Sequence, residues 1–325
     1  MNQKLSKYIN YLSENNPSPF CDYIISKELL RLDAETVQGA YEWARQFKLY
    51  AEIEQEQLPD GSWGGFDTAH TELTKKKHYN ATARAILRLL DLSLDGINDP
   101  MVMRVVDVMK KYLSGELPDP EFYGKNNDIK PILIRRQIML NLGCFEPEND
   151  YVKDLRNSIA ERYKKSCAAG YFNREIWRNS DITPEAADWS TGDVYLLSYK
   201  NSGNVISDDL QRILLAHEWA NAGWVDPCDI KSPEESNFIF WITPLERLQK
   251  FSLFGEFMAE KAAPHLYDIC ERIVNDRGNQ MQIFINNYFY HHGQYSESRN
   301  SIQKKKNDLL LQIIRLLDKC DICQE

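Results

Sequence analysis

Apolar residues recur with helical spacing along almost the whole chain, and this pattern constrains the fold more than any other feature. Between residues 100 and 114, apolar side chains recur at intervals of about one helical turn, at Val102, Val105, Val106, Met109 and Leu113. An i, i+3, i+4, i+7 stripe of this kind is typical of an amphipathic helix with one buried face. The sequence therefore predicts an all-α fold.

Glycine–aromatic turns interrupt the helices at wide intervals. They are clearest in the segments 61–63, 170–172 and 223–224, with a degenerate form at 118–124 and a glycine without its aromatic at Gly278. The steps from Gly61 to Gly278 average about 54 residues, which is the length of two helices and two connections. A period of this length indicates repeated helix pairs.

The period sorts the predicted helices into two sets of six. The outer set covers residues 1–13, 34–57, 99–114, 149–168, 206–221 and 260–275. The inner set covers residues 18–32, 78–94, 129–143, 187–200, 237–258 and 300–319. We expect an α/α toroid of about twelve helices in a single domain over residues 1–325, with an open superhelical stack of helix pairs as the alternative.

Residues 57–64, with the sequence Gln-Leu-Pro-Asp-Gly-Ser-Trp-Gly, resemble the QW motif of the squalene cyclase and prenyltransferase α/α-toroid superfamily. Residues 78–87 are similar to the start of an inner helix in that family. Residues 16–23 are similar to the opening of small bacterial toroid proteins that carry the repeat without an assigned role. The resemblance covers residues 15–115 closely. It implies that Trp63 is structural and that Gln57 helps to tie one repeat to the next.

The resemblance also implies terpenoid chemistry, but the two carboxylate motifs of that chemistry are missing. Residues 207–209 contain only the last pair of an Asp-x-Asp-Asp cluster, and residues 208–212 lack the final Asp of Asp-Asp-x-x-Asp. The candidate catalytic acids are instead Asp67, Asp188 and Asp193, each in or near a turn that enters a predicted inner helix. Trp189 beside two of them could raise a carboxyl pKa and stabilise a carbocation. The alternative is that these residues only cap a helix.

Basic residues gather before two predicted inner helices, at 75–77 and 304–306. Helix N-termini and lysines together favour anions, so Lys75, Lys76 and Lys77 are candidates to bind a diphosphate or carboxylate head. His78 and Tyr79, at the start of the same helix, and Trp189 complete the predicted substrate-binding set. The alternative is a solvated run of charges.

A zinc site is the one cofactor that the sequence suggests. Asp226 and Cys228 have the Asp-x-Cys spacing of protein prenyltransferase β subunits, and His291 follows at a suitable separation. Thiolate, imidazole and carboxylate are suitable zinc ligands. The family places this pair at the head of an inner helix, whereas Asp226 follows Gly223 and Trp224 closely, so a chance pattern is the alternative.

Composition narrows the function further. The net charge of −9 disfavours nucleic-acid binding, which depends on lysine and arginine. The N-terminus is too polar for a signal peptide, and the longest apolar run, residues 238–242, is too short to span a membrane. We expect a cytoplasmic protein with reduced thiols; peripheral membrane contact and the oligomeric state stay open.

Three functions fit this sequence. The first is binding or transformation of an isoprenoid or other apolar ligand in a central cavity. The second is a non-catalytic binding or scaffolding toroid that has lost the acids. The third is a carbohydrate-active (α/α) enzyme with an aromatic-lined cleft, which would need two carboxylates facing that cleft.

Overall fold

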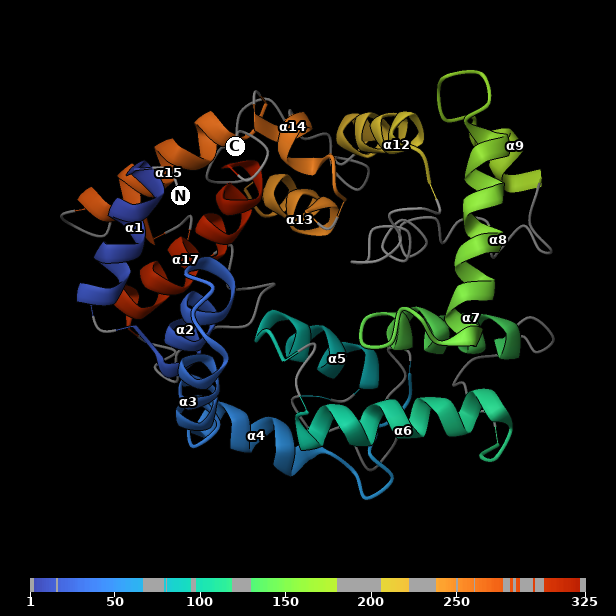
Figure 1. The fold of residues 1–325 in the computed structure, drawn as a ribbon, viewed down its shortest axis with the longest axis horizontal. Coiled ribbons are helices and arrows are strands. Elements are labelled where there is room, and N and C mark those ends of the chain that lie inside the picture. The colour runs from blue at the N-terminus through green and yellow to red at the C-terminus, as the bar shows by residue number, and fades with distance from the viewer. Residues whose placement is uncertain are drawn as a thin grey trace. The chain divides into compact units, whose positions relative to one another are not determined.

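The computed structural model describes residues 3–15, 17–66, 79, 81–94, 98–118, 130–179, 206–221, 238–249, 251–259, 261–276, 281–282, 285–286, 295 and 301–321 (Figure 1). Within these ranges all the regular elements are helices, which confirms the all-α prediction. They are α1 (Gln3–Glu14), α2 (Pro19–Ile24), the π-helix η1 (Ile25–Leu29), α3 (Ala34–Ala44), α4 (Lys48–Glu56), α5 (Thr82–Asp91), α6 (Pro100–Ser114), α7 (Lys130–Gly143), α8 (Asp150–Ser166), α9 (Arg174–Asn179), α12 (Asp208–Asn221), α13 (Phe238–Leu248), α14 (Phe254–Ala259), α15 (Ala263–Asn275) and α17 (Ile302–Asp321).

Helix boundaries follow the local sequence, and α6 is the clearest case. The Asp99 carboxylate accepts hydrogen bonds from the backbone N–H groups of Met101 and Val102, at 2.8 and 3.2 Å, and Pro100 occupies the first turn. Gly115 ends the helix with φ of +81°, in the left-handed region that glycine adopts most easily. Asp99, Pro100 and Gly115 therefore fix both ends of α6.

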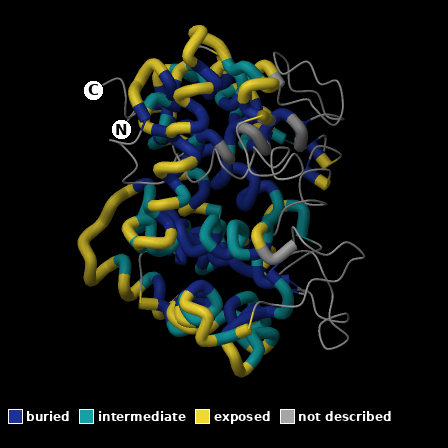
Figure 2. Tube along the Cα trace, turned by 90° about the vertical axis from the view of Figure 1, so that its right-hand side faces the viewer, coloured by how far each residue is buried: buried dark blue, intermediate teal, exposed yellow. Residues whose placement is uncertain are grey.

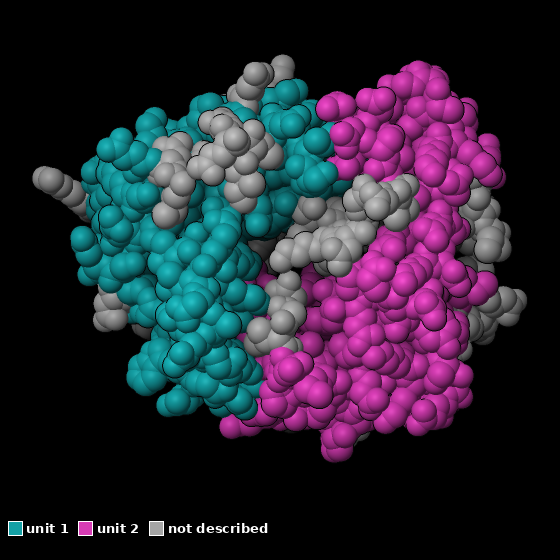
Figure 3. Space-filling view, in the orientation of Figure 1, with its two compact units in different colours: residues 1–51, 214–325 teal, residues 52–213 magenta. Residues whose placement is uncertain are grey.

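The chain divides into two compact units, drawn in different colours in Figure 3. One unit contains residues 1–51 and 214–325. Its centre is α17, which contacts α1, α14, α15 and η1. Apolar side chains lie on nearly all sides of α17 and are at most 1% exposed; they are Leu309, Leu310, Leu311, Ile313, Ile314, Leu316 and Leu317. Figure 2 colours the described trace by how far each residue is buried.

Residues 52–213 form the second unit. Here α6, α7, α8 and α9 pack against one another in chain order. Sequence neighbours are thus spatial neighbours, as in a repeat of helix pairs. The single domain over residues 1–325 and the ring of six inner and six outer helices remain predictions.

Two predicted helices are each broken into two. Residues 34–57 form α3 and α4, because the Gln46 side-chain amide donates to the Glu42 carbonyl at 3.1 Å while the Gln46 backbone N–H bonds Trp43 instead. Residues 237–258 form α13 and α14, separated by a turn in which the Phe251 N–H bonds the Leu248 carbonyl. The short helix α9 was not predicted, and the helix predicted at 187–200 lies outside the described residues.

The Gly-Trp turn connects α4 to α5 through Trp63. The Trp63 side chain is fully buried, and its Nε1–H donates to the Ile53 carbonyl at 2.9 Å. The Trp63 backbone N–H donates to the Thr82 hydroxyl at 3.0 Å, and this hydroxyl donates to the Gly64 carbonyl at 2.8 Å. The predicted structural role of Trp63 agrees with this geometry.

The same turn contacts α6 through Gly61 and Gln57. Gly61 has φ of +96°, and a Cβ there would lie 2.6 Å from the Arg104 carbonyl oxygen. The Gln57 amide donates to the carbonyls of Gly61 and Met101, at 2.8 and 3.1 Å, and its oxygen accepts from Arg104 Nε at 2.6 Å. Gln57 therefore ties the end of α4 to α6. Its role in joining one repeat to the next stays a prediction.

The second glycine–aromatic turn, after α8, is built differently. Gly170 has φ of +82°, but the adjacent Tyr171 is 59% exposed. The buried aromatic is Trp177 on α9, whose ring lies 4.1 Å from Tyr163 and 3.6 Å from the Arg162 guanidinium. Both turns contain a glycine with positive φ. The buried tryptophan of the second turn, however, lies on the following helix, α9.

Candidate functional site

Most of the predicted site residues lie outside the described part of the chain. These are the candidate acids, the basic tract, its histidine, the aromatic beside the acids and the proposed zinc ligands: Asp67, Asp188, Asp193, Lys75, Lys76, Lys77, His78, Trp189, Asp226, Cys228 and His291. Their roles stay predictions. Among the described residues, no group of three or more potential ligands is placed to hold a metal ion.

Tyr79 is the one predicted substrate-binding residue that the structure describes. Its backbone N–H donates to a Glu56 carboxylate oxygen at 2.6 Å, and only 8% of the residue is exposed. Burial raises the pKa of the Tyr79 hydroxyl, and a hydrogen bond with Arg88 opposes this shift. Tyr79 is thus held against the end of α4 and beside α5, and its contact with a substrate stays a prediction.

Helix α5, which follows Tyr79, has one deeply buried face and one free face. Ala85, Ile86 and Leu89 are fully buried, whereas Leu87 is 61% exposed. Arg84, one turn before Leu87, is also exposed. The exposed face of α5 therefore presents a large apolar side chain next to a cation, on a helix whose opposite face is core.

Helix α7 belongs to the same unit and was also predicted to be an inner helix. Ile132, in its first turn, is 49% exposed, while Ile138 and Leu142 are fully buried. Two predicted inner helices of this unit thus leave an aliphatic side chain in solvent. A large exposed apolar side chain gains about 1.5–3 kcal/mol when an apolar partner covers it completely.

The other unit contains a cluster of polar groups around α17, buried at Asp308 and half-exposed at Arg31, which we call the α17 cluster. Its first part surrounds the Asp308 carboxylate, which is 1% exposed. Asp308 accepts from the Tyr295 backbone N–H at 3.0 Å and from the Cys21 thiol at 3.5 Å. The Ser18 hydroxyl donates to the Cys21 sulfur at 3.2 Å. Burial and the nearby Asp308 raise the pKa of the Cys21 thiol, so this thiol stays protonated and unreactive.

The second part of the α17 cluster consists of two ion pairs to α17, one from η1 and one from the residues just after it. Arg315 binds both carboxylate oxygens of Glu28, at 2.8 and 2.9 Å, and Arg31 binds Asp318 at 2.7 Å. Burial raises the pKa of Asp318, and the Arg31 charge opposes this. Arg31 has φ of +50°, an unusual conformation for a residue with a side chain. The π-helical turn η1, which carries Glu28, is a kind of element frequent at functional sites. Here its charged group is paired with a charge on α17.

A third ion pair corrects one sequence expectation. Lys306, the last residue of the predicted basic tract at 304–306, binds Asp276 at 2.8 Å, and both side chains are buried. Its charge is therefore neutralised inside the unit rather than offered to an anion. A run of lysines in the sequence does not show which of them is buried. A buried lysine needs an acidic partner, and that partner comes from a distant part of the chain.

The α17 cluster was not predicted from the sequence. Its members lie far apart in the chain, with Glu28 and Arg315 separated by 287 residues. A local sign is the occurrence of polar residues at 312 and 315 within the otherwise apolar stretch 309–317. Such positions indicate a buried polar network, but they do not name its partners.

Comparison with known proteins gave no matching family model, no matching curated protein and no matching solved structure. In the described residues, no helix is both long enough and apolar enough to cross a membrane.

Proposed function

We propose that this protein binds an isoprenoid or another apolar ligand on the free faces of its inner helices, as a toroid of the squalene cyclase and prenyltransferase type. The observation that carries the proposal is Leu87, an aliphatic side chain 61% exposed on a helix whose other face is fully buried. The Gly-Trp turn supports the toroid part, because Trp63 bonds both α4 and α5, and Gln57 bonds α6. Transformation of the ligand is not part of the proposal.

The chemistry of the α5 face defines the ligand class. Leu87 offers only dispersion and hydrophobic contact, so an apolar chain suits it better than a sugar does. Arg84 lies one turn away and is exposed, and it could pair with an anionic or polar head. An isoprenoid with a polar end satisfies both residues.

Native mass spectrometry of the purified protein is the first test, because a bound lipid then appears as an added mass. The second is a titration with farnesol, followed by intrinsic tryptophan fluorescence. We expect Leu87→Asp to weaken farnesol binding at least tenfold, since binding would then have to desolvate a carboxylate. Met103→Asp is the matched control, because Met103 is 58% exposed on the predicted outer helix α6.

Equal binding by both variants would refute the α5 face as the binding site. Absence of any added mass and of any farnesol binding in the natural protein would refute the proposed function itself.

A non-catalytic scaffold is the second candidate, and the α17 cluster favours it. Glu28, Arg315, Arg31 and Asp318 are engaged with one another rather than with an open space. Ion pairs of this kind fix a geometry and perform no reaction. A protein without bound ligand, and without farnesol affinity, would agree with this candidate.

A further inference from the structure

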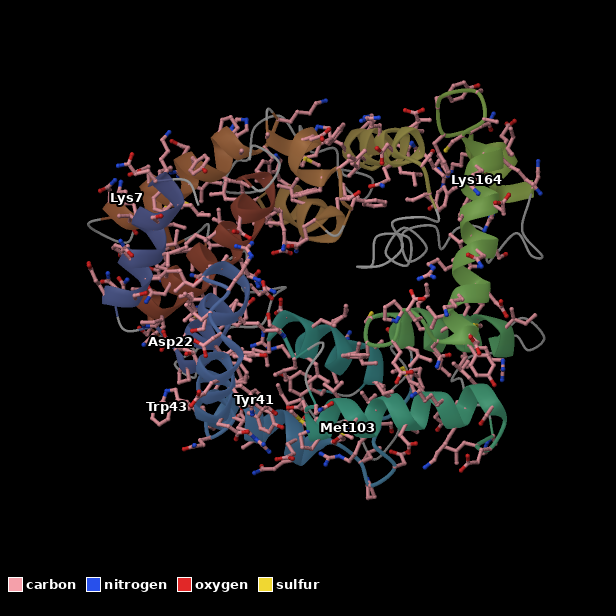
Figure 4. All side chains as sticks on the ribbon, in the orientation of Figure 1. Lys7, Asp22, Tyr41, Trp43, Met103 and Lys164 are labelled. Atoms are coloured by element: carbon pink, nitrogen blue, oxygen red, sulfur yellow. The ribbon has the colours of Figure 1, made fainter. Side chains whose placement is uncertain are left out.

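The outer surface of α3 has features that its own chain does not explain. Most of this helix is exposed, and only Tyr41 and Ala44 are buried. Trp43 lies on the opposite side of the helix from Tyr41 (Figure 4) and is 52% exposed. Phe47 packs edge-on against Trp43 with ring centroids 5.1 Å apart, so the indole is held in place at the surface. Leu32, just before the helix, is also 41% exposed.

Gly39 is the second unexplained feature of this surface. It lies in the middle of α3, one turn before Trp43 and on the same face. A Cβ at Gly39 would meet no atom within 4 Å, and the backbone there is ordinary helix. A mid-helix glycine costs roughly 0.5–1 kcal/mol relative to alanine. The chain's own packing therefore does not require this glycine, whereas a partner approaching closely would.

We propose that a second copy of this chain docks on α3, with the two α3 helices antiparallel about a two-fold axis. The surface carries a projecting Trp43 and a recess at Gly39, one helical turn apart. A two-fold axis between them places the Trp43 ring of each copy over Gly39 of the other. A surface of this kind is complementary to itself, as an isologous dimer interface requires.

The charges of the segment agree with the antiparallel arrangement. Asp33 and Glu35 lie at the start of α3, and Lys48 lies just after its end, whereas Arg45 lies over the buried Tyr41 and Tyr50 rings on the other side of the helix. In an antiparallel pair, the acidic start of one helix faces the basic end of the other at both edges of the interface. A parallel pair would instead place like charges together. The charge pattern thus selects one geometry.

The size of the surface sets the expected affinity. A stable interface uses about 20–30 residues from each copy. The segment from Leu30 to Lys48 supplies fewer, so we expect a reversible dimer with a dissociation constant in the micromolar range. Trp43 is the expected anchor, since tryptophan is among the residues that contribute most at interfaces.

Sedimentation equilibrium of the full chain over about 1–200 µM tests the proposal. We expect the average mass of the natural protein to rise from monomer toward dimer over this range. Trp43→Asp should raise the dissociation constant at least tenfold, and Met103→Asp, an equally exposed control on α6, should leave it unchanged. A natural protein that stays monomeric, or two variants with equal effects, would overturn the proposal.

Two further variants separate docking from a purely structural role. Gly39→Ala should raise the thermal midpoint of the monomer at low concentration and yet weaken the dimer, because the methyl group holds the second Trp43 away. Glu35→Lys and Lys48→Glu should each weaken the dimer, and the double variant should restore it. A Gly39→Ala variant that dimerises like the natural protein, or a double variant without restoration, would refute the antiparallel α3 interface.

Discussion

Replacing Gly61 by alanine should destabilise the second unit more than the same change at Gly115 or Gly170. The residue has φ of +96°, where an alanine costs about 1–2 kcal/mol. The added Cβ would also lie 2.6 Å from the Arg104 carbonyl oxygen, a distance that forces the turn away from α6. Overpacking of this kind costs roughly 1–3 kcal/mol. We therefore expect a total loss of about 2–5 kcal/mol in the free energy of unfolding.

Two other glycines serve as controls for this prediction. Gly115 and Gly170 have φ of +81° and +82°, yet a Cβ at either position meets nothing within 4 Å. Their alanine variants should lose only the conformational cost, about 1–2 kcal/mol. Urea unfolding followed by circular dichroism measures all three. If Gly61→Ala loses no more than the other two, the close approach to α6 does not contribute, and the reasoning from Cβ geometry is wrong.

Further predictions concern Gln57 and two separate carboxylates, Asp318 and Glu271. Gln57→Leu removes three hydrogen bonds and should lower the free energy of unfolding by roughly 2 kcal/mol. Arg104→Met removes fewer and should cost about half as much in the same urea unfolding experiment. Equal costs would show that the bonds from Gln57 to the backbone carbonyls contribute nothing. The pKa of Asp318 is raised by burial, so its folded form gains a proton before its unfolded form as the pH falls. Relative to Asp318→Asn, the natural protein should gain stability as the pH falls through the folded pKa, with the gain complete below 3.8. The pKa of Glu271 is lowered, chiefly by its hydrogen bond from Lys7, so relative to Glu271→Gln the natural protein should lose stability as the pH falls below 4.5. Urea midpoints of the natural protein and of both variants, measured from pH 3 to pH 7, test the two opposite pH dependences. Curves of midpoint against pH that run parallel for all three proteins would contradict them.

The helices could be predicted from the sequence because their determinants are local. The apolar stripe of α6, its Asp99 cap and its terminal Gly115 all lie within the helix or next to it. The break between α3 and α4 was not predicted, although the contact that accompanies it is local too. It depends on the Gln46 side chain binding the Glu42 carbonyl, a choice that an amphipathic pattern does not record.

The polar groups of the α17 cluster could not be predicted, because each of their bonds joins distant parts of the chain. Glu28 and Arg315 read as ordinary surface residues when each is considered in its own helix. Lys306 was placed in a basic tract for the same reason, and its buried bond to Asp276 forms only when the end of α15 packs against α17. The sequence gives the charge of such groups, and the fold decides whether that charge faces solvent.

The glycines illustrate why residue type alone does not reveal a role. At Gly61 the backbone is left-handed and α6 leaves no room for a side chain, so the fold itself demands glycine. Gly115 is left-handed with open space around it, so only the conformation demands glycine. At Gly39 neither condition holds, and the residue lowers the stability of its own helix. A glycine that no internal constraint requires, beside an exposed tryptophan, is best explained by something outside the chain. Since neither backbone conformation nor packing within the chain requires glycine at residue 39, the α3 interface is the explanation that remains for it. This interface does not depend on the ligand proposed for α5.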